Sequence, residues 1–354
     1  MSRAVDVVWD ESFLAYNFGP THPMSPVRVD LTIRLARELG VLDHAGVRII
    51  DAQPASDELL RLVHVQGYID AVKEAGHTGK TNLIRGLGDD DNPVFPSMHE
   101  ASAHIVGATV ACAAAVLNGQ VEHAVNVTGG LHHAMPDHAS GFCVYNDPAV
   151  AIAWLLASGV QRVAYVDVDV HHGDGVERVF YDDPRVMTVS LHESGRTLWP
   201  GTGWPDRCGG PAALGTAVNV ALPAGTGDDR WLRAFHAIVP PLVEAFAPQF
   251  LVTQHGADTH LLDPLADLAL TVDAQRAAAV ELHALAHRFT GGRWLATGGG
   301  GYEVVDVVPR AWTHLIAEAV GHPVDPATEV PATWREYVVA LLGRPGPARM
   351  TDGR

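Results

Sequence analysis

The stretch VAYVDVDVHHGDG (163–175) holds the pattern that decides both the fold and the chemistry of this chain. Residues 163–170 are apolar apart from two aspartates, which predicts a strand in the middle of a sheet. Because side chains alternate across a strand, Asp167, Asp169 and His171 should share one face and the valines the other. Two buried carboxylates side by side repel each other, and a cation between them removes the conflict. The stretch therefore predicts a strand leading into a metal site, rather than an edge strand with a solvated acidic face.

Seven other short apolar segments predict strands, and helical patterns lie between many of them. The segments are 5–10, 47–51, 123–129, 186–191, 217–222, 250–254 and 293–298. Clear helical stretches include 98–117, 148–158, 229–247 and 274–289. Strands that alternate with helices indicate an α/β fold with a central, mostly parallel sheet and helices on both faces. We expect one catalytic domain over residues 1–343, followed by a weakly ordered tail over 344–354.

Four of these strands run into polar, glycine-rich segments that should meet at one edge of the sheet. In parallel sheets ligands bind beyond the carboxyl ends of the strands. Asp258 follows one of the strands and is the best candidate for a third metal ligand, although a loop aspartate is more often a cap or turn residue. A set of Asp169, His171 and Asp258 leaves a position open for water and substrate, as in catalytic zinc sites.

Two neighbouring histidines and a tyrosine extend this predicted site. His132 and His133 read as a surface pair when taken alone. The spare carboxylates of Asp167 and Asp174 could each accept a hydrogen bond from one of them, which would make one a general base and the other a proton donor. The run 298–301 is all glycine, so its backbone can approach a ligand closely. The hydroxyl of Tyr302 could donate to a developing oxyanion, unless this segment is only a flexible turn with a packed aromatic.

Charge and cysteine content limit the class of protein. The formal net charge is −17, from 24 basic and 41 acidic residues among 354. Such a field disfavours nucleic acid and anionic membranes and favours cationic partners, although acidic surfaces also simply keep proteins soluble. Three distant cysteines fit no disulfide framework, which predicts a reducing, cytoplasmic setting. No signal-peptide pattern opens the chain and its apolar runs stop short of a membrane span, so we expect no membrane partner.

Taken together, the motifs closely resemble the arginase/deacetylase superfamily, specifically histone deacetylases and the bacterial acetoin-utilisation deacetylases. The similarity runs from YNFGPTHPMSPVR (16–28) through GLHHA (130–134), GFCVYND (141–147) and GAD (256–258) to GGGGY (298–302). This covers most of the chain, in the order found in the family. The stretch DNPVFPSMHE (91–100) looks more like the bacterial group.

The resemblance implies one catalytic Zn²⁺ per chain, held by Asp169, His171 and Asp258, although Fe²⁺ also suits mixed nitrogen and oxygen ligands. It implies that His132, paired with Asp167, is the general base, and that His133, paired with Asp174, protonates the leaving amine. Tyr302 would polarise the acetyl carbonyl. A structural K⁺ behind the zinc is also implied, with ligands drawn from Asp167, Asp169, His171, Ser190 and Leu191.

The resemblance further implies a narrow substrate channel. Phe142 and Trp199 would flank the methylene chain, the backbone of Gly141 would accept from the scissile N–H, and Gly300 would approach the substrate within the glycine run. Asp91 matches a rim carboxylate. Leu265 stands where polyamine-specific relatives carry a gatekeeping acid, which argues mildly against a polyamine substrate. Arg28 matches an arginine on the route by which acetate leaves.

We therefore expect a zinc-dependent hydrolase that removes the acetyl group from Nε-acetyl-lysine in proteins or peptides. Its water would be activated by the metal, with a His–Asp base and a tyrosine that polarises the carbonyl. The alternatives are an acetylpolyamine or other small-molecule amidohydrolase, an arginase-type ureohydrolase with two Mn²⁺, and a non-catalytic acetyl-lysine binding protein. The oligomeric state stays open.

Overall fold

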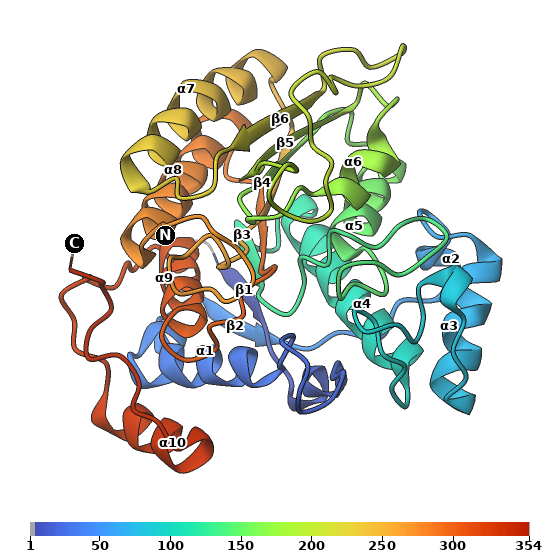
Figure 1. The fold of residues 1–354 in the computed structure, drawn as a ribbon. Coiled ribbons are helices and arrows are strands. Elements are labelled where there is room, and N and C mark those ends of the chain that lie inside the picture. The colour runs from blue at the N-terminus through green and yellow to red at the C-terminus, as the bar shows by residue number, and fades with distance from the viewer. Residues whose placement is uncertain (1–3, 354) are drawn as a thin grey trace.

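A single eight-stranded sheet forms the centre of the computed structural model, which describes residues 4–353 (Figure 1). The strand order is β2-β1-β3-β8-β7-β4-β5-β6, and every neighbouring pair is parallel. The strands are β1 (Val5–Val8), β2 (Val47–Ile50), β3 (His123–Asn126), β4 (Val163–Asp167), β5 (Val186–Glu193), β6 (Ala217–Leu222), β7 (Phe250–Gln254) and β8 (Trp294–Thr297). Seven of the eight predicted segments contain one of them, and β5 starts with its predicted segment 186–191 but runs two residues further, to Glu193.

Helices cover both faces of this sheet, which confirms the predicted fold class. Figure 1 shows α1, α7, α8 and α9 on one side and α4, α5 and α6 on the other. The α-helices are α1 (Val27–Glu38), α2 (Asp57–Leu60), α3 (Gln66–Thr78), α4 (Met98–Leu117), α5 (Asp147–Ala157), α6 (Asp174–Phe180), α7 (Asp228–Phe246), α8 (Val272–Thr290), α9 (Val308–Val320) and α10 (Ala332–Leu342). Short 3₁₀ helices are η1 (Glu11–Ala15), η2 (Val41–Asp43) and η3 (Leu83–Arg85).

The central strands are apolar on both sides because each side faces a hydrophobic core. In β7, Phe250 and Val252 belong to the core under α4 and α5, whereas Leu251 belongs to the core under α7, α8 and α9. Parallel strands buried on both faces read as nearly continuous apolar runs for this reason. Within residues 4–353, α4 alone has the length and composition of a membrane span, and 78% of that window is buried inside the fold.

Strand β4 is shorter than the predicted range 163–170, because it ends at Asp167. Asp169 and His171 therefore lie in the following loop, and strand alternation does not explain why they lie together. The loop is instead shaped by successive side-chain turns, in which Asp167 Oδ1 accepts from the Asp169 N–H (3.1 Å) and Asp169 Oδ1 accepts from the His171 N–H (3.0 Å). Aspartates commonly bond the backbone two residues ahead in this way.

The residues after Gly343 pack against the body of the protein, in contrast to the expected weakly ordered tail. Arg344 pairs with Asp306 (2.9 Å) and Glu303. Met350 is fully buried beside α1 and α10. Asp352 binds Arg310 at 2.7 Å. The tail was expected to be weakly ordered. Its charged residues and Met350 nevertheless contact segments far away in the sequence, which the local sequence does not indicate.

Candidate active site

Asp169, His171 and Asp258 converge beyond the carboxyl ends of β4 and β7, and all three are buried. His171 Nδ1 lies 3.1 Å from Asp169 Oδ1 and 3.2 Å from Asp258 Oδ2. One ligand atom from each residue lies within 4.8 Å of the other two. Tetrahedral ligands about 2.0–2.2 Å from a zinc ion lie roughly 3.3 Å apart, so these residues fit such a cation.

The charge state of this group also favours a cation. Burial and the nearby Asp169 raise the pKa of Asp258 to about 7. Burial alone would lower the pKa of His171, but its bonds to Asp169 and Asp258 raise it to about 10. Positive charge between the two carboxylates therefore stabilises their ionised forms. A divalent cation supplies more of that charge than a proton on His171 does.

Backbone and amide donors hold the two carboxylates in place. Asp169 Oδ2 accepts from Gln254 Nε2 (2.7 Å) and from the Gly300 N–H (2.8 Å). Asp258 Oδ1 accepts from the Val170 N–H (3.0 Å). A Cβ at position 300 would lie 1.9 Å from Asp258 Oδ2, so only glycine allows this approach. Gly300, predicted to bind substrate, therefore supports the metal ligands directly.

The structure brings together both predicted histidine–aspartate pairs. His132 Nδ1 lies 2.7 Å from Asp167 Oδ2, and His133 Nδ1 lies 2.7 Å from Asp174 Oδ1. The two Nε2 atoms face each other at 3.0 Å. Each carboxylate thus fixes the ring nitrogen that it binds and leaves the Nε2 edge available for proton transfer.

The two imidazoles have opposite pKa shifts. Burial would lower the pKa of His132, but Asp167 and Asp169 outweigh it and raise the pKa to about 9. Burial, reinforced by the neighbouring His132, lowers the pKa of His133 to about 4. Titratable neighbours whose environments separate their pKa values are typical of acid–base sites.

Two residues at the start of α5 position the histidine loop, and the sequence analysis gave them no role. Asp147 Oδ1 accepts from the N–H groups of Gly130 (3.0 Å) and Leu131 (2.8 Å). Asn146 Nδ2 donates to the His132 carbonyl at 3.1 Å, while its Oδ1 caps α5. Burial raises the pKa of Asp147 to about 6. An Asn-Asp-Pro start predicts only a helix cap, so the sequence held no signal for this second role.

A cavity of about 280 Å³ leads to His133 and His171. Phe142 packs edge-to-face on Tyr302 with ring centroids 5.6 Å apart, and Trp199 packs on His133 at 4.7 Å. At Gly141 the φ angle is +53°, and a Cβ there would lie 2.5 Å from the Trp199 ring. The lining also contains Leu198, which the sequence analysis missed, together with Asp91 and Leu265. Of the residues predicted for the channel, Gly141, Phe142, Trp199, Asp91 and Leu265 line this pocket, whereas Gly300 is not among its lining residues.

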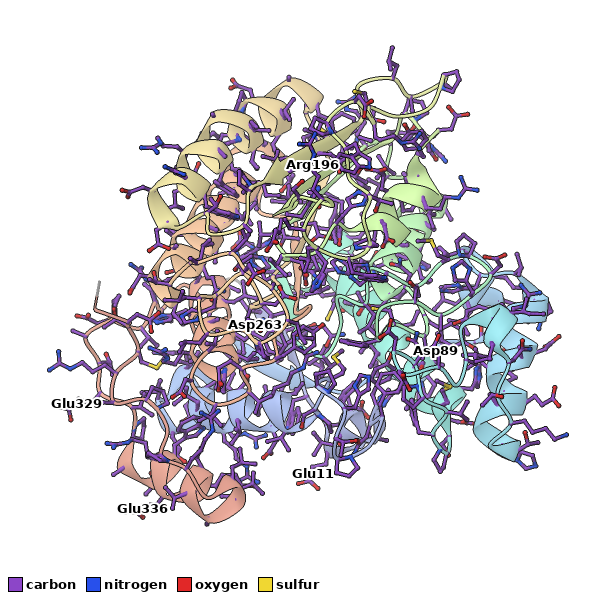
Figure 2. The ribbon with its side chains drawn as sticks, viewed as in Figure 1. Glu11, Asp89, Arg196, Asp263, Glu329 and Glu336 are labelled. Carbon is purple, nitrogen blue, oxygen red and sulfur yellow. The ribbon has the colours of Figure 1, made fainter. Side chains whose placement is uncertain are left out.

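The backbone of Tyr302 is fixed by a hydrogen bond to Asp263, a residue to which the sequence assigned no role. The buried Asp263, labelled in Figure 2, accepts from the Tyr302 N–H at 2.8 Å and from the Leu265 N–H at 3.0 Å. Burial raises the pKa of Asp263 to about 6. One side chain thereby positions both the tyrosine and a residue of the pocket wall.

Arg28 and three of the predicted potassium ligands, Asp167, Ser190 and Leu191, are not among the residues that line the pocket. Arg28 Nη1 donates to the carbonyls of Gly299 (2.9 Å) and Gly301 (3.0 Å), so it holds the glycine run. A small cavity of about 20 Å³ adjoins its side chain. Asp167 and Ser190 are register partners on β4 and β5, and the buried Leu191 follows.

Known proteins are similar to this chain over most of its length. The family model for the histone deacetylase domain matches residues 22–319. The acetoin utilization protein AcuC of Bacillus subtilis (strain 168) is 43% identical over 331 residues, covering 92% of this chain and 84% of that protein. AcuC of Staphylococcus xylosus is 35% identical, covering 94% of this chain and 87% of that protein. The crystal structure of an HDAC homolog complexed with SAHA matches with a TM-score of 0.85 at 30% identity, covering 96% of this chain and 89% of that one. The chain therefore belongs to the histone deacetylase family, and within it to the acetoin-utilisation type.

Proposed function

We propose that this deacetylase is zinc-dependent and hydrolyses the side-chain amide of Nε-acetyl-lysine in proteins or peptides. One observation carries the proposal. The buried ligand group of Asp169, His171 and Asp258 adjoins two His–Asp pairs at the inner end of a pocket walled by Phe142 and Trp199. An acetamide on a thin, flexible chain suits a pocket of this kind. Bound by the three ligands, zinc would supply Lewis acidity and lower the pKa of water.

The chain's own residues account for the proton transfers. A cation bound at Asp169 would offset part of the negative charge that raises the pKa of His132. His132 Nε2 can then take the proton from the attacking water, and Asp167 stabilises the imidazolium that forms. The proton can then pass from His132 Nε2 to His133 Nε2, 3.0 Å away, and from there to the leaving amine, with Asp174 orienting the His133 ring. The Tyr302 hydroxyl donates to the acetyl oxygen as negative charge develops there. Burial keeps the pKa of Tyr302 well above its ordinary value, so the hydroxyl retains the proton that it donates.

The pocket walls and mouth support this choice of substrate. Phe142 and Trp199 enclose the methylene chain, and the Gly141 carbonyl accepts from the scissile N–H. Asp91 lies exposed among the pocket-lining residues, where its carboxylate can bind the backbone of a peptide. The net charge of −17 favours basic substrates on approach. Leu265 gives the wall an apolar side chain, which disfavours acetylated polyamines because they carry a second cationic amine.

Further parts of the proposal concern ions and setting. Fe²⁺ is an alternative to zinc for the same ligands. A structural K⁺ would use groups of Asp167, Asp169, His171, Ser190 and Leu191. A cytoplasmic setting suits the three free cysteines, two of them buried.

A substrate panel tests the proposal. Acetate release is measured with acetyl-lysine peptides, free acetyl-lysine and acetylputrescine, using zinc-loaded protein. We expect the highest kcat/KM on peptides. Activity confined to acetylputrescine would establish the small-molecule alternative, and no turnover of any substrate by zinc-loaded protein would favour the acetyl-lysine binding protein.

A further inference from the structure

A second group of potential metal ligands lies at the amino-terminal ends of the strands, opposite the carboxyl ends that carry the active site. His123 is the first residue of β3, and it is the register partner of Trp294, the first residue of β8. The amino ends of these parallel strands lie together, away from the carboxyl ends that carry the active site. His283 and His287 reach the same place from α8.

The three imidazoles point their Nε2 atoms at one another. His283 Nε2 lies 3.0 Å from His123 Nε2 and 2.9 Å from His287 Nε2. One nitrogen from each ring lies within 4.8 Å of the other two. His283 and His287 are four residues apart, so they share one face of the helix. Nitrogens about 2.0–2.1 Å from a zinc ion are roughly 3.3 Å apart, which matches this spacing.

Hydrogen bonds among the three rings cannot satisfy this arrangement. A neutral imidazole nitrogen carries either one hydrogen or one lone pair. His283 Nε2 faces two other ring nitrogens, so a single hydrogen or lone pair serves only one of them in good geometry. A cation at the point of convergence accepts all three lone pairs at once.

The surroundings keep the rings neutral and oriented. Burial, with a contribution from neighbouring histidines, lowers the pKa of His123 to about 3 and that of His283 to about 4. The Trp294 ring stacks on His283 with centroids 5.2 Å apart. Glu122 Oε1 lies 3.8 Å from His287 Nδ1, on the side of that ring away from the convergence. This distance is longer than a hydrogen bond, so Glu122 places negative charge near the His287 ring without fixing its orientation.

We propose that His123, His283 and His287 bind a divalent transition-metal ion, with Zn²⁺ the first candidate, as a second metal site separate from the active site. Three neutral imidazoles suit zinc, nickel and copper and leave one position for water or an anion. His123 is buried and His287 exposed, so the ion can enter from solvent on the side of α8. A bound ion would tie α8 to the start of β3. This proposal does not depend on the substrate or activity of the other site.

Zinc content per chain tests the proposal after equilibration with a zinc buffer and removal of loosely bound metal. We expect the wild-type protein to hold two equivalents, His287→Gln to hold one, and Asp258→Asn to hold one. His287 is exposed on its helix, so its replacement should preserve the fold and the deacetylase activity. His236→Gln, an exposed histidine on α7, is the matched control and should keep two.

A thermal-shift measurement isolates the second site. In the Asp258→Asn background zinc should raise Tm, and adding His287→Gln should abolish that shift, because only binding to the folded state stabilises it. The proposal is overturned if wild-type protein holds a single zinc that Asp258→Asn removes. It is equally overturned if His287→Gln keeps the second equivalent.

Discussion

His132 Nδ1 lies 2.7 Å from Asp167 Oδ2, and the same oxygen accepts a bond from the Tyr165 hydroxyl at 2.7 Å. Asp167 is therefore a fixed acceptor that sets the tautomer of the proposed base. Replacing Asp167 by Asn keeps the shape but removes the charge that stabilises the imidazolium. We expect kcat to fall about a hundredfold to ten-thousandfold, the range of a lost general base. Steady-state kinetics measure it, with Asp70→Asn on the surface of α3 as control. Unchanged kcat would show that the charge of Asp167 does not support the proposed base.

Tyr302→Phe should retain fold and zinc but lower kcat by about a hundredfold to a thousandfold, because one donor to the oxyanion is lost. The Phe142 contact survives, since the ring itself is kept. Tyr181→Phe, away from the pocket wall at Tyr302, provides the matched control. Turnover close to that of the wild type would remove the tyrosine from the mechanism.

Gly300→Ala should lower both zinc content and stability. The added methyl group would lie 1.9 Å from Asp258 Oδ2 and 3.0 Å from Asp169 Oδ2, so the ligands must move. We expect a loss of roughly 1–3 kcal/mol in unfolding free energy, the usual cost of overpacking. Gly67→Ala on α3 is the control, because its methyl group meets nothing closer than 3.7 Å. Wild-type metal content in Gly300→Ala would show that the glycine run is not under this constraint.

Asp352 should give the protein an acid-sensitive contact. Burial alone raises its pKa, but the bonds to His260, Val272 and Arg310 outweigh it and lower its pKa well below the ordinary range. The Asp352 carboxyl therefore binds a proton more readily in the unfolded chain than in the folded protein. Its contribution to the free energy of unfolding is fully present above pH ~4 and is lost as the pH falls toward the pKa of the folded state. Asp352→Asn should lower Tm at pH 7 and make little difference near pH 2. A Tm difference that does not shrink on acidification would contradict this, and Asp206→Asn is the exposed control.

Leu265→Glu should move substrate preference toward acetylated polyamines. A carboxylate on the pocket wall would attract the second ammonium group of an acetylated polyamine. A partly exposed ion pair contributes about 1 kcal/mol, so kcat/KM for acetylputrescine should rise roughly fivefold. Leu262→Glu, exposed and not among the pocket-lining residues, is the control. A ratio of acetylputrescine to peptide activity that stays constant would show that Leu265 does not discriminate between them.

Sequence reasoning located the strands because each lies between two apolar cores and reads as a short apolar run. It located the ligands because β4 and β7 end in Asp- and His-rich segments. It failed at the end of β4, where aspartate side chains shape the backbone and no residue type marks the change. It also missed Asn146, Asp147, Gln254 and Asp263. Their bonds join segments far apart in the chain, which leaves no local pattern, and the same is true of His123 and α8.

The central claim is that a metal held by Asp169, His171 and Asp258 drives hydrolysis of acetyl-lysine. The most direct measurement is acetate release from an acetyl-lysine peptide by metal-stripped protein, before and after zinc is restored. We predict no release without metal, recovery with zinc in the wild type, and no recovery in Asp258→Asn. Full activity in the stripped protein, or zinc-dependent recovery in Asp258→Asn equal to that of the wild type, would contradict the account.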